Sequence, residues 1–326
     1  MNTKKYLVTG GCGFIGSALV RRLVREGHQV RVLDNQSRGL ATRLTEVAED
    51  CELIAADIRD AQAVQQAAQG VDSVCHLAFV NGTEFFYTKP DLVLDIGVKG
   101  MVNVIEACLQ HDIGELVLAS SSEVYQTPPA VPTDETVPLS IPDPWNPRYS
   151  YGAGKIISEI MALNYGKHHF ERILIFRPHN VYGPDMGWEH VIPQFILRMK
   201  ALCQDATDPV PFPIQGTGKE TRAFVFIDDF IDGLLLMLER GEHLGIYHIG
   251  TMEEVTIAEV AHLIGNYFGK SIEIVPGDLA PGGTPRRCPE IKKLVALGYQ
   301  PKYSLREGIP IIAKWYDENA HQAPIT

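Results

Sequence analysis

Three features that mark other classes of protein are missing from this sequence: paired cysteines, a long apolar run and a basic block. The six cysteines, at positions 12, 51, 75, 108, 203 and 288, form neither a CxxC pair nor a metal-ligand spacing. We therefore expect reduced thiols in a cytoplasmic protein and no metal site. No stretch of about 18 apolar residues occurs, which predicts no membrane-spanning helix and no membrane partner. The opening residues MNTKKYLVTGG reach glycine after three apolar residues, too few for a secretory signal.

Positive charge is also scarce. The chain has 29 Lys and Arg against 40 Asp and Glu, a net charge of −11, without a basic block. Binding to a nucleic-acid backbone needs clustered Lys and Arg, so we expect no nucleic-acid partner. What the chain does have is apolar content: 45% of its 326 residues are hydrophobic. That is ample for a large core, and the length suggests roughly two domains.

The first half of the chain alternates between strand and helix patterns. Short apolar runs typical of buried strands stand at 6–8, 30–33, 51–57, 73–79, 115–121 and 172–178. Helical spacing of apolar residues appears between them, at 15–26, 61–69, 92–110 and 153–169. This alternation predicts an α/β fold in which helices cover both faces of a doubly wound, Rossmann-type parallel sheet.

The pattern changes after about residue 180, where proline and glycine become frequent. A strand-helix unit, AFVFIDDFIDGLLLMLER at 223–240, interrupts this stretch and indicates a return to the sheet. We therefore predict a Rossmann domain formed by 1–178 and 223–250. A smaller, discontinuous α+β domain, 179–222 and 251–326, would bind the substrate in a cleft between the two.

The sequence TGGCGFIGS at 9–17 follows a strand and opens a helix. Its glycines, at 10, 11, 13 and 16, satisfy both GxGxxG and GxxGxxG spacings, and they allow the tight turn and close approach that a pyrophosphate needs. Asp34 ends the next strand, 18 residues after Gly16. Its carboxylate suits a ribose 2′-hydroxyl and repels a 2′-phosphate, which favours NAD over NADP. The alternative is a glycine-rich turn that binds nothing.

A tyrosine and a lysine share one helix face in YSYGAGK, residues 149–155. Tyr151 and Lys155 are four residues apart, whereas Tyr149 pairs with Ala153. A nearby ammonium and an oxidised nicotinamide ring would lower the phenol pKa, so that Tyr151 takes a hydroxyl proton as hydride leaves the same carbon. The alternative is an ordinary surface pair.

A serine cluster, SSSEVY at 120–125, follows the strand ELVLA. Parallel sheets bind ligands where their strands end, so a serine hydroxyl here would hydrogen-bond the reacting oxygen. The alternative is a helix cap or a polar turn.

These motifs together resemble a known family. TGGCGFIG, Asp34, AADIRD, HLA, SSSEVY, YGAGK, RPHNVYGP and TRAFVFIDD occur in this order along essentially the whole chain. The chain is similar to the extended short-chain dehydrogenase/reductases, specifically the NAD-dependent nucleotide-sugar epimerase/dehydratase family. The resemblance implies NAD as cofactor, a nucleotide-diphosphate sugar as substrate and a homodimer.

The resemblance also implies roles for individual residues. The implied catalytic residues are Tyr151, Lys155, Ser121, Ser122 and Glu123. The implied NAD-binding residues are Gly10, Gly13, Phe14, Ile15, Gly16, Asp34, Asn35, Asp57, Ile58, Leu77, Ala78, Tyr151, Lys155 and Pro178. Asn180, Arg222 and Arg287 would grip the diphosphate of the substrate, which two arginines from separate segments suit well.

Three positions depart from the family pattern. Gly97 stands where Asn is usual, and Gln126 stands where Gly is usual. Glu123 is an acid that simple 4-epimerases mostly lack, whereas dehydratases and uronic-acid decarboxylases carry one; most 4,6-dehydratases have Asp where Ser122 stands.

The implied reaction begins with oxidation of the sugar at C4. Epimerisation is the best single expectation. A 4,6-dehydratase or a uronic-acid decarboxylase is the alternative within the same chemistry. A non-catalytic NAD-binding regulator is the alternative of another class.

Overall fold

The computed structural model describes residues 3–204, 208–278 and 284–324. Seven parallel strands form one sheet in the order β11-β6-β5-β4-β1-β2-β3. They are β1 (Lys5–Thr9), β2 (Gln29–Asp34), β3 (Cys51–Ala55), β4 (Ser73–His76), β5 (Glu115–Ala119), β6 (Arg172–Pro178) and β11 (Gly245–Ile249). The order reverses at β1, which confirms the predicted doubly wound Rossmann-type fold.

Helices cover both faces of this sheet because strand side chains alternate between two apolar clusters. Leu7, Leu116 and Ile175 belong to one cluster, and their neighbours Val8 and Val117 belong to the other. Helices α2 (Ala61–Ala68), α4 (Pro90–Gln110) and α5 (Ser150–His169) pack in the first cluster, and α1 (Phe14–Arg25) and α7 (Ile227–Arg240) pack in the second. The short helix α3 (Thr83–Thr88) precedes α4.

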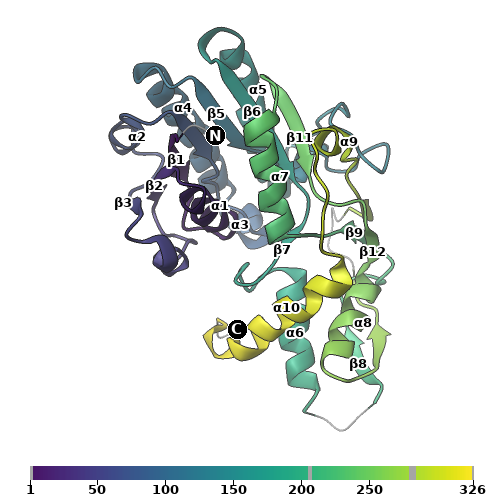
Figure 1. The fold of residues 1–326 in the computed structure, drawn as a ribbon. Coiled ribbons are helices and arrows are strands. Elements are labelled where there is room, and N and C mark those ends of the chain that lie inside the picture. The colour runs from purple at the N-terminus through teal and green to yellow at the C-terminus, as the bar shows by residue number, and fades with distance from the viewer. Residues whose placement is uncertain (1–2, 205–207, 279–283, 325–326) are drawn as a thin grey trace.

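Most of the other elements form a smaller part of the molecule, in the lower half of Figure 1. Three of its helices, α6 (Val191–Leu202), α8 (Ile257–Tyr267) and α10 (Leu305–Glu318), pack on one another. Its strands are β7 (Val181–Tyr182), β8 (Val210–Pro213), β9 (Thr221–Ala223), β10 (Val225–Phe226), β12 (Glu254–Thr256), β13 (Ile272–Val275) and β14 (Arg286–Arg287). The remaining helical turns are α9 (Lys292–Val295), η1 (Ala41–Val47), η2 (Ser122–Tyr125), η3 (Pro147–Tyr149) and η4 (Ala320–Gln322).

The segment 223–240 forms a strand and a helix, but its strand does not enter the large sheet. Strand β10 pairs with β7, α7 then packs on β6 and β11, and β11 enters the sheet beside β6. The return to the sheet is thus made by 245–249, within the predicted range 223–250. The division into two domains stays a prediction, and its ranges include residues 1–2, 205–207, 279–283 and 325–326, which lie outside the described residues.

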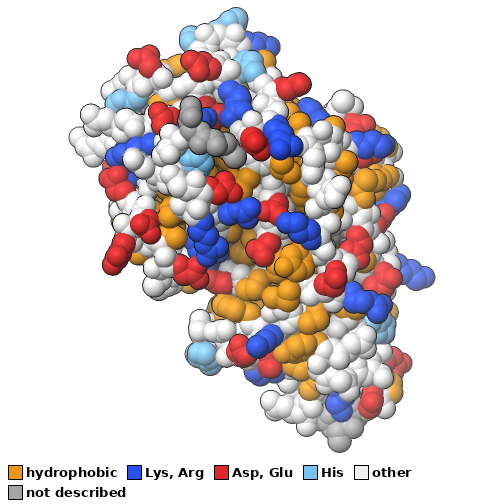
Figure 2. All heavy atoms as spheres, viewed as in Figure 1, with side chains coloured by type: hydrophobic (Ala, Val, Ile, Leu, Met, Phe, Trp, Pro, Cys, Tyr) orange, Lys and Arg blue, Asp and Glu red, His pale blue; other side chains and the backbone are white. Residues whose placement is uncertain are grey.

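The carboxyl ends of four central strands meet at one edge of the sheet. The register pairs Thr9 with His76 and Ala119 with Phe176, so the residues that follow these strands are neighbours. Figure 2 shows charges of both signs scattered over the face viewed, with apolar side chains exposed where the two parts of the molecule meet. Within the described ranges, no helix has both the length and the apolar character needed to cross a bilayer.

Candidate active site

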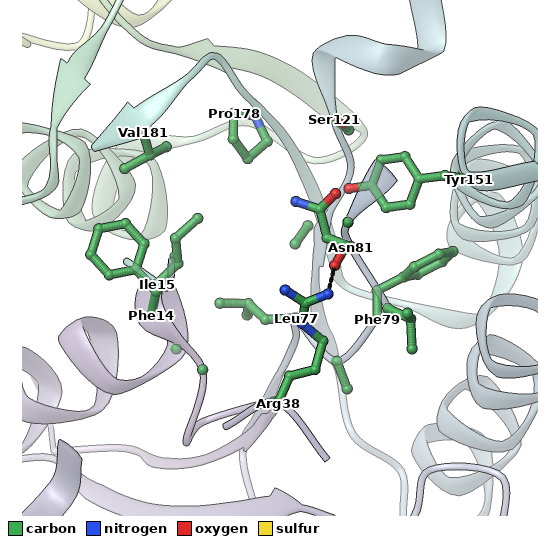
Figure 3. A pocket seen from close by; sticks show the side chains of 18 of the residues that line it. Phe14, Ile15, Arg38, Leu77, Phe79, Asn81, Ser121, Tyr151, Pro178 and Val181 are labelled. Atoms are coloured by element: carbon green, nitrogen blue, oxygen red, sulfur yellow. Dashed lines mark hydrogen bonds between the residues drawn. The ribbon is translucent and has the colours of Figure 1, made fainter. Parts of the chain in front are cut away.

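A cavity of about 750 Å³ opens at this edge of the sheet. Figure 3 shows Phe14, Ile15 and Val181 on one wall and Tyr151 and Phe79 on the other. Every predicted catalytic, NAD-binding and substrate-binding residue except Arg222 lines it. The tertiary structure therefore brings together residues that the sequence spreads from Gly10 to Arg287.

The glycine turn forms the floor of the cavity, between β1 and α1. Gly10 has φ +73°, a conformation that side chains disfavour. A Cβ at Gly16 would stand 2.1 Å from the Gly10 carbonyl oxygen, so the turn closes only with glycine there. Helix α1 begins at Phe14 and points its N-terminus at the cavity. This cradle fits the diphosphate of a dinucleotide.

Asp34 is buried at the end of β2 and ties the glycine turn to the next loop. Its carboxylate accepts hydrogen bonds from the backbone N–H of Cys12, at 2.9 Å, and of Gln36, at 2.7 Å. Each oxygen keeps acceptor capacity for a ribose hydroxyl. Arg38, four residues on, donates to the Asn81 carbonyl oxygen and to Glu189 instead of facing Asp34. The acidic character of this position is thus not neutralised by Arg38, which fits NAD.

Two of the predicted NAD-binding residues, Asp57 and Ile58, lie after β3. Asp57 accepts hydrogen bonds from Arg59 and from Asn35 Nδ2, and those to Arg59 are the main reason that its pKa falls to about 2. Arg59 also binds Asp95 on α4, which anchors the loop. Ile58 is buried, and its side chain occupies the room left by Gly100 on α4, where a Cβ would stand 2.3 Å from Ile58 Cδ1.

Tyr151 and Lys155 lie in the first two turns of α5, on the same face. The Lys155 Nζ donates to the Ala119 carbonyl oxygen at 2.7 Å and lies 5.8 Å from the centre of the Tyr151 ring. Burial lowers the pKa of Lys155 to about 7, and Glu159 opposes that shift. Burial raises the pKa of Tyr151, a hydrogen bond with Ser121 lowers it, and Glu123 raises it. By itself the protein therefore keeps the phenol protonated, and a further positive charge is needed for it to act as a base.

The serine cluster forms the helix cap that was considered as the alternative, and it also contacts Tyr151. Ser121 is the N-cap of η2, where its Oγ accepts from the Glu123 backbone N–H at 3.1 Å. The same side chain is hydrogen-bonded to Tyr151. Ser122 is buried and also lines the cavity. One hydroxyl, that of Ser121, thus caps the helical turn and contacts Tyr151 at the same time.

Glu123 stands among three arginines. Its Oε1 accepts a hydrogen bond from Arg287 Nη1 at 2.7 Å, and Arg287 also donates to Thr284. Burial of Glu123 opposes its ionisation, but Arg287, with weaker effects of Arg148 and Arg222, lowers its pKa overall. One carboxylate against three guanidinium groups leaves this end of the cavity positively charged, which suits an anionic substrate.

Of the three predicted substrate-binding residues, Asn180 and Arg287 line the cavity and Arg222 lies behind its wall. Asn180 lines the cavity and donates to the Ala223 carbonyl oxygen at 2.9 Å. Strand pairing sets Arg222 beside Arg287, but the Arg222 guanidinium donates to the carbonyl oxygens of Thr221 and Thr284, each at 2.7 Å. Burial lowers the pKa of Arg222 to about 10, with Arg287 adding to the effect. Arg222 therefore reinforces the charge behind Arg287.

Arg148 and Phe79 are among the cavity residues that the sequence analysis did not identify. Arg148 stands three residues before Tyr151, and its Nε is buried without a hydrogen-bond partner among the described residues. Phe79 directly follows HLA and packs on Tyr151. A polar residue just before the tyrosine and a bulky one after HLA were the available signals, but neither belongs to a motif.

The departure at Gln126 has a structural reason. Its φ is +52°, in the left-handed region where glycine is favoured. The side chain compensates by donating from Nε2 to the Glu123 carbonyl oxygen at 2.6 Å, and Thr284 donates to the Gln126 carbonyl oxygen at 3.1 Å. These contacts hold the turn after Glu123 in a conformation that a side chain rarely adopts.

The chain is similar to known proteins in sequence and in fold. A model of the NAD dependent epimerase/dehydratase family matches residues 6–250. The UDP-glucuronic acid decarboxylase 5 of Arabidopsis thaliana is 32% identical over 318 residues, which cover 94% of this chain and 88% of that protein.

Two solved structures are similar over nearly their whole length. The UDP-glucose 4-epimerase of Thermus thermophilus, in complex with NAD, is 29% identical with a TM-score of 0.83, and the match covers 96% of this chain and 99% of that one. The dTDP-glucose 4,6-dehydratase DesIV of Streptomyces venezuelae, with NAD bound, is 29% identical with a TM-score of 0.85, and the match covers 98% of each chain. The decarboxylase, the epimerase and the dehydratase carry out three different reactions.

Proposed function

This chain belongs to the NAD dependent epimerase/dehydratase family, whose model matches it over residues 6–250, and on that premise we propose that it converts a nucleotide-diphosphate sugar through transient oxidation at C4. Bound NAD supplies the acceptor for the hydride that leaves C4. The observation that carries the proposal is the Tyr151 hydroxyl, which points into the cavity and is hydrogen-bonded to Ser121. A base in that position is what the oxidation of an alcohol requires.

Each nearby side chain has a defined part in this proposal. Tyr151 takes the C4 hydroxyl proton while the C4–H bond breaks, and it returns the proton when the ketone is reduced. Ser121 orients the phenol. Lys155, whose pKa is about 7, is partly an ammonium at neutral pH and favours the phenolate. Asn180, Arg287 and, behind it, Arg222 bind the anionic end of the substrate.

Epimerisation is the first outcome that we propose. If the 4-keto sugar rotates in the cavity, hydride returns to the opposite face of C4. The configuration at C4 is then inverted and no other bond changes. The test is incubation of the purified protein with GDP-, UDP-, CDP- and dTDP-sugars, followed by mass spectrometry and chromatography of the products. A product of unchanged mass and inverted C4 supports epimerisation, and no turnover of any sugar would contradict the proposed function.

Glu123 and the arginines around it favour a second outcome, elimination or decarboxylation. A ketone at C4 acidifies the C5 hydrogen and labilises a carboxylate attached to C5. Glu123 stands two residues from Ser121, beside Tyr151, where it can remove the C5 hydrogen and start loss of water. The surplus of guanidinium groups suits a uronic-acid carboxylate. Loss of about 18 or about 44 mass units, for one water or one CO2, distinguishes these two reactions from epimerisation.

The interpretation as a non-catalytic regulator is not supported. The chain belongs to a family of enzymes, and it keeps both Tyr151 and Lys155 in one cavity.

We also propose that the protein is a cytoplasmic homodimer. Helix α5 exposes Ile157, Ile160 and Tyr165, with 38%, 52% and 40% of each residue accessible. An apolar face of this kind is best covered by another chain. Light scattering of the wild type and of Ile160→Glu checks this; a monomeric wild type would contradict it.

A further inference from the structure

Phe79 occupies the space between the catalytic tyrosine and lysine. It follows β4, and Figure 3 shows its ring on the Tyr151 side of the cavity. The Phe79 and Tyr151 ring centres are 5.1 Å apart with an interplanar angle of 85°, an edge-to-face contact. The Lys155 Nζ lies 4.1 Å from the centre of the Phe79 ring. One apolar ring thus contacts both members of the pair.

Two glycines make room for this ring. A Cβ at Gly97, on α4, would stand 2.5 Å from Phe79 Cζ and 2.6 Å from Cε2. A Cβ at Gly154, on α5, would stand 3.0 Å from the same Cζ. The Asn that the family pattern places at 97 is therefore incompatible with Phe79 as it lies here. The departure at Gly97 and the presence of Phe79 are one structural feature.

The surroundings of Lys155 contain few groups that favour its charged form. Lys155 is 3% exposed, and the Ala119 carbonyl oxygen is the acceptor of its hydrogen bond. Among titratable neighbours, Glu159 on α5 raises its pKa, while Glu159 is itself bound by Arg177 of β6. His76 of β4 is a further neighbour. Burial is the main cause, and the charge of Lys155 the second, that lower its pKa to about 3, so the His76 ring is neutral.

We propose that Phe79 is a positioning residue that holds the Lys155 ammonium against its ring face and fixes Tyr151 through its edge, replacing the polar side chain that the family places at 97. The negative face of an aromatic ring attracts a cation most strongly where water is excluded. Phe86 packs on Tyr151 as well, stacked at 4.9 Å and 21°. Phe86 restrains the phenol but has no described contact to Lys155. Replacing Phe86 therefore disturbs Tyr151 without disturbing the ring that faces Lys155.

The test follows the Lys155 charge directly and does not depend on knowing the substrate. The NAD-bound protein is labelled with ¹³C at the lysine Cε, and Lys155→Met identifies the Lys155 signal, which is then titrated by NMR. Phe79→Leu keeps an apolar side chain but removes the ring, and we expect the Lys155 pKa to fall by about 0.5–1.5 units.

Phe86→Leu is the matched control, and it should not shift the Lys155 pKa. An unchanged pKa in Phe79→Leu, or an equal shift in Phe86→Leu, would overturn the proposal. Because the readout is a proton equilibrium, failure to find the sugar substrate affects only the proposed function.

A second pair of variants covers the case in which Phe79→Leu does not fold. Gly97→Ala displaces the ring without changing it and should also lower the Lys155 pKa. Gly100→Ala, one turn along the same helix, meets Ile58 instead and should leave it unchanged. The same shift in both alanine variants, or in neither, would contradict the role of Phe79.

Discussion

At the scale of single residues, the chemistry of Tyr151 depends on what surrounds the phenol. Phe79 and Phe86 restrain the ring from two sides, so that the hydroxyl faces the cavity and Ser121. Burial raises its pKa, and the group is therefore a base only beside added positive charge. A reactive group that is inert until its partners are bound protects the site from side reactions.

Replacing Tyr151 by Phe should lower kcat at least about 100-fold, because the ring stays but the base is lost. NAD binding, measured by calorimetry, should change little. Tyr149→Phe is the matched control, two residues earlier at the start of the same helix, and its effect should be mild. Equal losses in the two variants would show that the wrong tyrosine has been assigned.

Glu123 decides between the proposed reactions. If it removes the C5 hydrogen, Glu123→Gln should slow the overall reaction while oxidation at C4 still occurs, seen as transient absorbance of reduced nicotinamide. Deuterium from solvent should then enter C5 in the wild type. Full activity of the Gln variant, with no deuterium at C5, would identify a plain 4-epimerase.

At the scale of elements, α5 is locked to the sheet by a buried ion pair. Glu159, one turn after Lys155, binds Arg177 of β6 at 2.6 Å, with side-chain exposures of 1% and 2%. Arg177 also donates to the Tyr125 hydroxyl, and Ser120 donates to Glu159. The position of α5, which carries Tyr151 and Lys155, therefore depends on a network in which each charge needs its partner.

Glu159→Gln should lower the free energy of unfolding by about 3–5 kcal/mol, because it leaves the Arg177 charge buried and uncompensated. Urea denaturation at pH 7 measures this. Glu318→Gln is the control, since it breaks the exposed Lys314–Glu318 pair on α10, and should cost less than about 0.5 kcal/mol. Similar losses in both variants would mean that burial does not govern the strength of the Glu159 pair.

At the scale of the whole molecule, the cavity is completed by segments far apart in the chain. Strand β14 carries Arg287 to Glu123, and its register with β9 sets Arg222 behind it. The glycine turn and Asp34 lie at the other end of the cavity, around the first strands. The proposed cofactor contacts and the proposed substrate contacts can therefore be changed separately by mutation.

Arg287→Ala and Arg222→Ala should weaken binding of the sugar nucleotide by about tenfold to a hundredfold each, as expected for charge-assisted hydrogen bonds worth about 1.5–3 kcal/mol. Binding of NAD should be unaffected. Arg286→Ala provides the control, because Arg286 is exposed and pairs with Glu254. Loss of NAD affinity in the first two variants would place these arginines in the wrong half of the cavity.

The sheet, the glycine turn and the tyrosine-lysine pair could all be predicted from the amino-acid sequence. Each depends on local spacing: apolar runs define the strands, Gly10 and Gly16 permit a turn that no side chain allows, and the i,i+4 interval puts Tyr151 and Lys155 on one helix face. Motif order then identified the family. Such features are predictable because neighbours in the chain are also neighbours in space.

The surroundings of these groups became visible only in the folded chain. It showed that Arg287 is paired with Glu123, that Arg222 lies behind the cavity wall, and that the strand returning the chain to the sheet is β11 and not β10. It also joined Phe79 to Gly97 and Gly154. These contacts link segments tens to hundreds of residues apart, and their geometry follows from packing, which no local pattern encodes.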